Sequence, residues 1–441
     1  MKRLVVLVLT LITIFSCSNV YAKDTVYSLN KYNEEIYKTI NKSYSSEGKV
    51  DGYIVAGTYQ KKDNEESENK NSKALVAKYD SYGKVLWTYT YGKDKNIDFN
   101  ALTYLYDEES NVAGYGIVLH DNNENKSYLI KINLSGKLLE EKELTIDDNV
   151  ISKVKEVRTS DNKFDSFIAI ATNNEKTYLI KYDKEFNEIW KKEYTEEGIT
   201  KAEYKDILPV YNNKELSGFV SVLEIEKEDN KTTKVLKYDV DGNIIKTIKE
   251  DFKTQTNISL VERENGFAIY GLTNDLKLQG NETTSYFINS YNENDEEIND
   301  TTGTTPINSK KRIKLLEVKE ENKLKEYLLL YTNATDESIE VVKINIDGVE
   351  ENKIKKINNN YYDIYDFNSN KNTLYIVGQI NCPDEDDCVY NNNSLFLISD
   401  EDKVIEVKES DNKNVITISI ISVLVIVILV LLRKKLKNRV Q

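Results

Sequence analysis

The chain has 441 residues, with 60 Lys and Arg against 74 Asp and Glu, and a net charge of −14 at pH 7. Residues 23–414 hold all 74 acidic residues but only 53 of the basic ones, so this stretch has a net charge of −21. Such a field disfavours nucleic acid and anionic polymers as partners and favours cationic ligands or divalent cations.

The first 22 residues are typical of a secretory signal peptide. Lys2 and Arg3 precede an apolar run over residues 4–15, and Val20-Tyr21-Ala22 provides a cleavage site after Ala22. We therefore expect residues 1–22 to be removed and the rest of the chain to be exported. Cys17 leaves a second interpretation open, in which it is the lipidated cysteine of a lipoprotein.

A short pattern then recurs seven times, at intervals of 50 to 56 residues. Each copy is an apolar strand, a tight turn and a second apolar strand. The residues that open the turns are Asp80, Asn133, Asp183, Asp239, Asn292, Asn345 and Ser399. Repeats of this length built from short strands are typical of β-propellers, in which each repeat forms one sheet, or blade.

The residue types fit these turns. Asp or Asn at the first position can accept a hydrogen bond from the backbone two residues further on, and glycine tolerates the left-handed conformation that follows. Glycine stands at that later position in four repeats, as Gly83, Gly136, Gly242 and Gly348. Three other repeats have Phe186, Asp295 and Asp402 there, which weakens the pattern.

A further strand connects successive repeats. Candidates are residues 101–106, 151–157, 204–210, 258–262, 313–318 and 362–367, with 36–43 as a seventh copy. Four strands in each of seven repeats predict an all-β, seven-bladed β-propeller over residues 23–408. Every blade can then be built from contiguous sequence. Alternatively, residues 26–29 add an edge strand that joins the last blade to the first, and the sequence leaves ring closure open.

Part of the first repeat resembles known propeller repeats. Residues 51–57 and 75–87 are similar to the repeats of bacterial secreted β-propellers and, loosely, to the quinoprotein-type motif. In that motif Ala, Asp, Gly and a closing Trp dock neighbouring blades. Ala77, Asp80, Gly83 and Trp87 fit it, and Trp190 fits it in the third repeat. The resemblance implies a propeller fold in which Trp87 and Trp190 dock blades.

Three connections between strands are long, at residues 58–73, 272–284 and 379–393. Because strand direction alternates, these loops share one rim, opposite the tight turns, and we expect them to form a binding face. Cys382 and Cys388 are predicted to form a disulfide in the last of these loops. Between them Asp384, Glu385, Asp386 and Asp387 are a candidate calcium site, and no other cofactor is expected.

No catalytic motif stands out. The single histidine, His120, is interpreted as an ordinary surface residue, and Arg158, Arg263 and Arg312 lie in separate repeats. The sequence shows no glycine-rich phosphate loop and no zinc motif. Carboxylate pairs for glycoside hydrolysis are too common in an acidic chain to be informative. We therefore do not expect an enzyme, with a propeller-based glycan hydrolase or lyase as the alternative.

Residues 415–432 are uncharged and long enough to cross a bilayer as a helix. A basic tail over residues 433–439 follows, and clustered cations at a helix end stay cytoplasmic. The predicted order is thus ectodomain, linker (409–414), membrane helix (415–432) and cytoplasmic tail (433–441). The Lys- and Asn-rich, Pro-poor composition suggests an AT-rich bacterial genome. These features predict a single-pass scaffold of the cell envelope that binds a protein or glycan, or alternatively a calcium-dependent adhesin.

Overall fold

The computed structural model describes residues 25–27 and 34–400, with gaps at 61–70, 94, 145–148, 174–175, 229, 251, 253–254, 264, 279–280, 321–322, 358–361, 371–372 and 381–393. Every regular element in this part of the chain is a β-strand. The described residues contain no helix that is both long and apolar enough to span a membrane. The predicted signal peptide, linker, membrane helix and basic tail lie outside the described residues.

The described strands form seven four-stranded antiparallel sheets. Six sheets each use four consecutive strands: β2 (Glu34–Tyr44), β3 (Val50–Gln60), β4 (Ser72–Asp80) and β5 (Val85–Tyr91); β6 (Ile97–Tyr106), β7 (Val112–Asp121), β8 (Lys126–Asn133) and β9 (Leu138–Leu144); β10 (Val150–Arg158), β11 (Phe164–Thr172), β12 (Thr177–Tyr182) and β13 (Glu188–Glu193); β14 (Lys201–Asn212), β15 (Glu215–Lys227), β16 (Asn230–Tyr238) and β17 (Ile244–Glu250); β18 (Gln255–Arg263), β19 (Gly266–Leu278), β20 (Asn281–Tyr291) and β21 (Glu297–Thr302); β22 (Lys314–Glu320), β23 (Lys323–Thr332), β24 (Ile339–Ile344) and β25 (Glu350–Ile357). The remaining sheet combines β26 (Tyr362–Asn370), β27 (Thr373–Ile380) and β28 (Ser394–Asp400) with β1 (Thr25–Tyr27).

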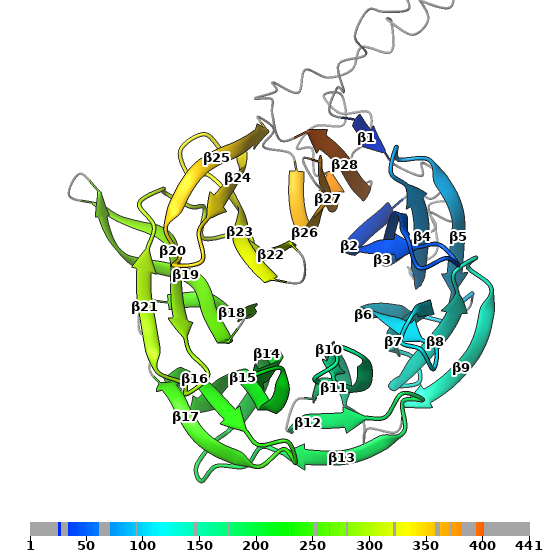
Figure 1. Ribbon diagram of the computed structural model, residues 1–441, viewed down its shortest axis with the longest axis horizontal. Helices are drawn as coiled ribbons and strands as arrows, with labels where there is room; N and C mark the ends of the chain where they lie inside the picture. Colours follow the sequence, from blue (N-terminus) through cyan, green and yellow to red (C-terminus); the bar gives the residue numbers. More distant parts are fainter. Residues whose placement is uncertain are drawn as a thin grey trace, which may run out of the picture. The chain divides into compact units, whose positions relative to one another are not determined.

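The sheets stand in a ring around a central axis, which is the arrangement of a β-propeller (Figure 1). The predicted all-β propeller class is therefore confirmed. In each sheet, one edge strand lies nearest the central axis of the ring, and it is the first of that sheet's consecutive strands. These inner strands are β2, β6, β10, β14, β18, β22 and β26. The segments that the sequence assigned as connectors between repeats thus supply the wall of the central channel.

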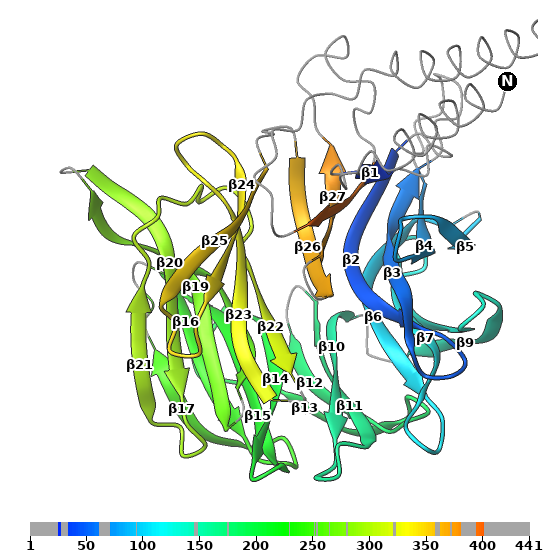
Figure 2. The same cartoon turned by 45° about the horizontal axis from the view of Figure 1, so that its top comes forward.

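Ring closure uses the edge strand that the sequence offered as one of two possibilities. β1 pairs with β28 in antiparallel register, with Val26 opposite Leu397. On its other side β28 pairs with β27, so this sheet contains strands from both ends of the described residues. Figure 2 shows β26 and β27 beside β2, the inner strand of the first sheet. The Tyr53 and Tyr375 rings stack across this junction with centroids 3.7 Å apart.

The core lies between the sheets rather than within any one of them. The middle strands of each sheet are covered on both faces by neighbouring sheets, so they read as apolar runs instead of alternating patterns. In β3, for example, Tyr53, Ile54, Val55 and Ala56 are all fully buried. Buried clusters accordingly join adjacent sheets, such as the one that packs Val118 and Leu129 against Phe167 and Ile180. A single repeat could not bury both faces alone, which is why the fold needs the ring.

The predicted turns have one shared geometry. In the first, the Asp80 side chain accepts hydrogen bonds from the backbone N–H groups of Tyr82 and Lys84, both at 2.9 Å. Five more turns have the same pair of bonds, to Asn133, Asp183, Asp239, Asn292 and Asn345. Asp and Asn are interchangeable here because the turn needs only the side-chain carbonyl or carboxylate oxygen.

The fourth turn residue is left-handed in all six of these turns. Gly83, Gly136, Gly242 and Gly348 have φ between 79° and 86°, and Phe186 and Asp295 have φ of 61° and 62°. A residue with a Cβ is strained there by about 1–2 kcal/mol. Both exceptions have compensating contacts: Phe186 is buried against Phe167, with ring centroids 4.2 Å apart, and Asp295 forms an ion pair with Lys237 at 2.5 Å.

These turns also contact the preceding sheet. The Trp87 indole of β5 donates a hydrogen bond to the Leu134 carbonyl at 3.0 Å and packs over Gly136 in the next turn. Trp190 of β13 lies in the same way against Gly242. Between three further pairs of sheets the contact is made by Lys142, which donates to the Glu185 carbonyl at 3.1 Å, by Lys237 on Asp295, and by the Thr301 hydroxyl, which donates to the Asp347 carbonyl at 3.1 Å.

One predicted loop is wrong. Residues 272–284 were expected to be a long connection, but β19 and β20 continue as a paired ladder through Leu276 opposite Thr283 and Leu278 opposite Asn281. The segment alternates apolar and polar residues with several threonines, which suits a strand better than a loop. The other two long connections fall largely on residues 61–70 and 381–393, outside the described residues.

We expect Gly136→Ala to destabilise the fold more than Gly48→Ala does. Both glycines are left-handed, with φ of 80° and 73°, so alanine costs about 1–2 kcal/mol at either position. A Cβ at Gly136 would lie 2.6 Å from the Trp87 ring, whereas nothing lies within 4 Å of one at Gly48. Overpacking should add about 1–3 kcal/mol at Gly136 alone. Urea denaturation of the two variants measures the difference.

A Trp87→Ala background provides the control. Without the indole there is room for the Cβ, so Gly136→Ala and Gly48→Ala should then have similar effects on the free energy of unfolding. A difference that persists in this background would show that the indole is not the obstacle.

Candidate functional site

The seven inner strands enclose a central cavity of about 2210 Å³. Its lining is strongly polar and contains ten Lys and Arg side chains against seven Asp and Glu side chains. The expectation from net charge, that the protein favours cationic ligands, therefore does not hold for the channel. Total charge reports the whole surface, whereas the lining depends on which strand of each sheet faces the axis.

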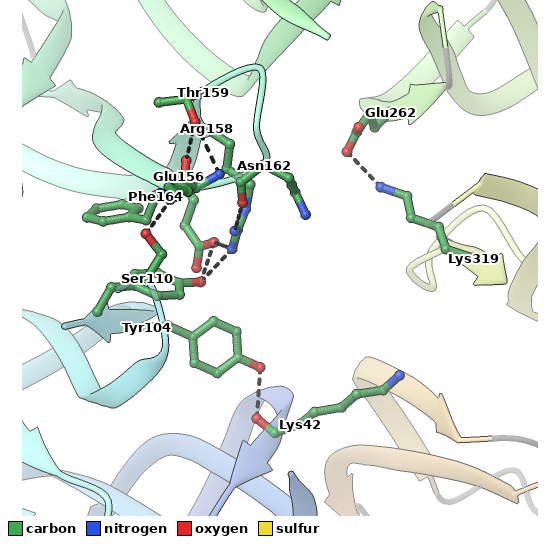
Figure 3. Close-up of polar contacts among 12 residues, drawn as sticks. Lys42, Tyr104, Ser110, Glu156, Arg158, Thr159, Asn162, Phe164, Glu262 and Lys319 are labelled. Atoms are coloured by element: carbon green, nitrogen blue, oxygen red, sulfur yellow. Dashed lines mark hydrogen bonds and ion pairs between the residues drawn. The ribbon is translucent and has the colours of Figure 1, made fainter. Parts of the chain in front are cut away.

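One end of the channel, where the inner strands finish, carries a group of aromatic and charged residues that we call the tyrosine mouth: Tyr44, Tyr104, Tyr106, Glu156 and Arg158. Figure 3 labels three of them, Tyr104, Glu156 and Arg158. The Tyr104 hydroxyl donates to the Lys42 carbonyl at 2.8 Å, and the Tyr44 and Tyr104 rings meet edge to face at 5.5 Å. Burial raises the pKa of Tyr104 well above its usual value, so the phenol stays neutral.

Arg158 is the best-held cation of the tyrosine mouth. Its guanidinium donates to the Glu156 carboxylate at 2.7 Å and to the Tyr106 hydroxyl at 2.8 Å, while the same hydroxyl donates to Glu156 at 2.6 Å. The Arg158 backbone N–H donates to the Tyr211 hydroxyl at 2.9 Å. The Arg158 side chain remains 30% exposed. These contacts fix a partly exposed Arg and its tyrosines in one geometry.

A second set of ion pairs stands at the same ends of β18 and β22. The Lys319 ammonium lies 2.9 Å from Glu262 and 3.0 Å from Glu317, and the Glu262 backbone N–H donates to Glu317 at 2.8 Å (Figure 3 shows the Glu262–Lys319 pair). Each of these carboxylates is already occupied by a cation or a donor. These contacts hold Lys319, Glu262 and Glu317 in one fixed arrangement at this end of the channel.

Deeper in the channel, a buried aspartate joins three consecutive inner strands. Asp206 of β14 forms an ion pair with Lys153 of β10 at 2.9 Å and accepts hydrogen bonds from the Ser259 hydroxyl and, at 2.9 Å, from the Leu260 backbone N–H of β18. Burial raises the pKa of the Asp206 carboxyl, but the neighbouring Lys153 and Lys155 ammonium groups outweigh it and hold the pKa well below its usual range.

Asp366 repeats this arrangement three sheets further on. It follows a bulge in β26, as Asp206 follows one in β14. Asp366 accepts hydrogen bonds from the Thr39 hydroxyl at 2.8 Å and the Ile40 backbone N–H at 3.2 Å, both in β2, and lies 3.2 Å from Lys314 of β22. The Asp366 carboxylate is the main reason that the pKa of Lys314 is raised. This aspartate therefore links the inner strands on both sides of the closing sheet.

Several sequence-predicted site residues cannot be placed. The candidate calcium residues Asp384, Glu385, Asp386 and Asp387 and the predicted disulfide Cys382–Cys388 lie outside the described residues. Within the described part of the chain, no group of three or more His, Cys, Asp or Glu side chains could hold a metal ion. The predicted turn and docking residues lie on the outer part of the sheets, away from the channel.

His120 is not the surface residue that the sequence suggested. It is only 4% exposed, and its Nδ1 atom lies 3.3 Å from the hydroxyl of Ser127, which is 2% exposed. Burial lowers the pKa of His120. The Ser127 hydroxyl also lies 3.3 Å from the Asn149 carbonyl oxygen, to which it donates. No substrate can reach a pair so deeply buried, so we interpret it as part of the core.

The arginines lie in separate repeats, as the sequence analysis stated. Of these, Arg158 and Arg312 both line the channel. They do not converge, because Arg158 ends β10 whereas Arg312 precedes β22 and stacks over the Tyr365 ring at 4.9 Å. The sequence analysis missed the channel residues Lys153, Asp206, Lys314 and Asp366. A usable signal was an aspartate directly before an apolar residue in the middle of an inner strand, as in Asp206-Ile207 and Asp366-Phe367.

Comparisons with known proteins were made with the sequence and with the fold. No family model and no curated protein matches the sequence. The chain is similar in structure to the Dos1 propeller, with 10% identity, 87% of this chain and 95% of that chain covered, and a TM-score of 0.48. It is similar to BBS1N, solved in complex with ARL6DN and soaked with lead, with 10% identity, coverages of 87% and 98%, and a TM-score of 0.48.

A third similar structure is the β-propeller domain of the trilobed protease from Pyrococcus furiosus, described as having an open velcro topology. It is 11% identical, with 84% of this chain and 100% of that chain covered and a TM-score of 0.46. Likenesses this distant say nothing about function. The propeller assignment rests on the sheet topology of this chain, and the resemblance to bacterial secreted and quinoprotein-type repeats remains a prediction.

We expect Asp206→Asn to lower the free energy of unfolding by about 2–3 kcal/mol at pH 7, because Lys153 loses its counter-charge. This loss of stability is near the low end of the range for removing one partner of a buried ion pair, because the Lys153 side chain is 39% exposed. The folded pKa of Asp206 is depressed, so its stabilisation is present above the unfolded pKa of about 3.9 and is lost as pH falls through the folded pKa. The gap between wild type and variant should therefore narrow below about pH 4 in urea titrations.

The matched control is Asp183→Asn, since Asn133 occupies the equivalent turn position. It should change the free energy of unfolding by no more than about 0.5 kcal/mol at pH 7. Equal losses in the two variants, or a gap for Asp206→Asn that stays constant down to pH 2, would contradict the role given to the Asp206 charge.

Proposed function

We propose that this protein is a non-catalytic scaffold of the bacterial cell envelope, anchored by a single membrane helix, whose propeller binds a protein or glycan partner outside the cytoplasm. The signal-like pattern of residues 1–22 and the apolar run of residues 415–432 with its basic tail support export and anchoring. The propeller fold supports the binding role only in general terms, because a fold does not define a function.

The observation that carries the proposal is the tyrosine mouth. Tyr and Arg are the residue types most enriched among binding hot spots, and tyrosine rings also stack on sugars. In this protein Tyr104, Tyr106 and Arg158 are held by one another and by Glu156, so little side-chain freedom is lost when a partner binds. Arg158 and Tyr104 both line the channel, where a partner could reach them.

The same contacts argue against catalysis at this place. Glu156, Glu262 and Glu317 each lie 2.7 to 3.0 Å from a cation, so each of these carboxyl groups already has a partner within the protein. A glycosidase needs one carboxyl group that can act as a proton donor. Glycan turnover by the purified protein, abolished by one carboxylate substitution, would support the enzyme alternative instead.

The calcium-dependent adhesin remains a second alternative through residues 384–387. Thermal stabilisation by calcium that disappears on replacing Asp384 and Asp386 would support it.

The proposal is tested by crosslinking the full-length protein in cells, purifying it in detergent and identifying captured molecules by mass spectrometry and glycan analysis. The variant Tyr104→Ala with Arg158→Gln removes the tyrosine mouth. Tyr82→Ala is the matched control, since Tyr82 is 83% exposed in the first outer turn. We expect a near-stoichiometric partner that is retained by Tyr82→Ala and reduced at least tenfold by the mouth variant.

A third variant, with residues 382–388 replaced by Gly and Ser, tests the binding face that the sequence analysis expected at the long loops. A partner lost only in this variant would move the binding face to the long loops and overturn the role of the tyrosine mouth. If no molecule is captured reproducibly by the wild-type protein, the scaffold proposal fails.

A further inference from the structure

Five cations in or just before three inner strands line the channel. We call them the cationic cluster: Lys38 of β2, Lys153 and Lys155 of β10, and Arg312 and Lys314 at the start of β22. Figure 1 shows that β10 is separated from β22 by the sheets of β14 and β18, so these side chains meet across the channel rather than along one sheet.

The pKa values of Lys38 and Lys153 are affected by other cations of the cluster. Burial lowers the pKa of Lys38; Asp98 opposes this, and the Arg312 guanidinium lowers the pKa further. Burial likewise lowers the pKa of Lys153 against the pull of Asp206, and the Lys155 and Lys314 ammonium groups add to the lowering. Like charges are thus close enough to destabilise one another.

The carboxylates nearby do not balance this charge. Asp206 and Asp366 pair with Lys153 and Lys314, at 2.9 Å and 3.2 Å. Their remaining oxygen lone pairs accept the hydrogen bonds from β18 and β2 described above. No carboxylate of the described residues lies within ion-pair distance of Lys38, Lys155 or Arg312. Over the whole lining, ten Lys and Arg side chains stand against seven Asp and Glu side chains, so the channel has an excess of three positive charges in a protein whose net charge is −14.

We propose that the channel binds a multivalent oxyanion, a group bearing phosphate or several carboxylates, at the cationic cluster. Such an anion replaces repulsion among the cations by attraction, and the low-dielectric walls strengthen each contact. Arg312 offers a planar fork for an oxyanion, while the lysines act as point charges. The cavity of about 2210 Å³ also admits a larger molecule that carries such a group. This proposal does not depend on the scaffold role.

The test is calorimetric titration of the full-length protein in detergent with inorganic pyrophosphate, and separately with citrate, at constant ionic strength. Three variants each remove one uncompensated cation: Lys38→Met, Lys155→Met and Arg312→Gln. Losing one charged contact should weaken binding about 10- to 100-fold. Lys137→Met, an exposed cation after the second turn, should leave the affinity unchanged.

The variants also give a readout that needs no ligand. Because burial is the main cause that disfavours the charged form of Lys38, Lys38→Met should be at least as stable as wild type in low salt, whereas loss of an ordinary paired lysine costs stability. This measurement confirms that a weakened affinity does not come from misfolding.

Binding of pyrophosphate alone supports a phosphate site, and binding of both anions supports a general multivalent oxyanion site. Absence of binding up to millimolar concentrations of both overturns the proposal. So does an affinity that Lys137→Met reduces as much as Lys155→Met does, because the effect would then belong to net charge rather than to the channel.

Discussion

The ring depends on two buried aspartates that each tie three consecutive inner strands together. Asp206 connects β10, β14 and β18, and Asp366 connects β22, β26 and β2. Adjacent propeller sheets share no ladder of backbone hydrogen bonds, and apolar packing between them is not directional. A carboxylate that receives a cation from one side and N–H and O–H donors from the other fixes how the inner strands meet. Only β6 lies outside these two groups of three.

In the outer part of the ring, neighbouring sheets are held in place by contacts to a repeated turn. Its geometry is constant, but the residue of the preceding sheet that contacts it is a tryptophan in two places, a lysine in two others and a threonine in a fifth. The turn can vary its partner because its own shape is set internally, by the Asp or Asn side chain and the left-handed residue. Where glycine is missing, Phe186 and Asp295 offset the strain with contacts that a glycine could not make. Docking and turn chemistry are therefore coupled.

The sequence predicted what depends on local pattern. The repeat interval indicated a propeller, and the turn residues could be chosen individually because Asp, Asn and Gly have a direct steric role. It left ring closure open, since both residues 26–29 and 36–43 could serve as strands. In the structure both segments do form strands: residues 26–29 overlap β1, and residues 36–43 lie in β2. The loop prediction at residues 272–284 failed because its alternating pattern continues a strand pair. Metal and disulfide predictions at residues 382–388 concern residues outside the described part.

The channel could not be predicted because its character depends on side chains brought together from different repeats. Lys153 and Lys314 are 161 positions apart in sequence, yet the ring places them close enough for one to lower the other's pKa. The net charge of the whole chain does not show where the cations and the acids lie relative to the channel. An acidic protein can thus contain a cationic channel, provided that the backbone of several strands fixes the cations and they cannot move apart. Asp206 and Asp366 hold Lys153 and Lys314 in the channel and also join the inner strands, so the site and the fold share one set of interactions.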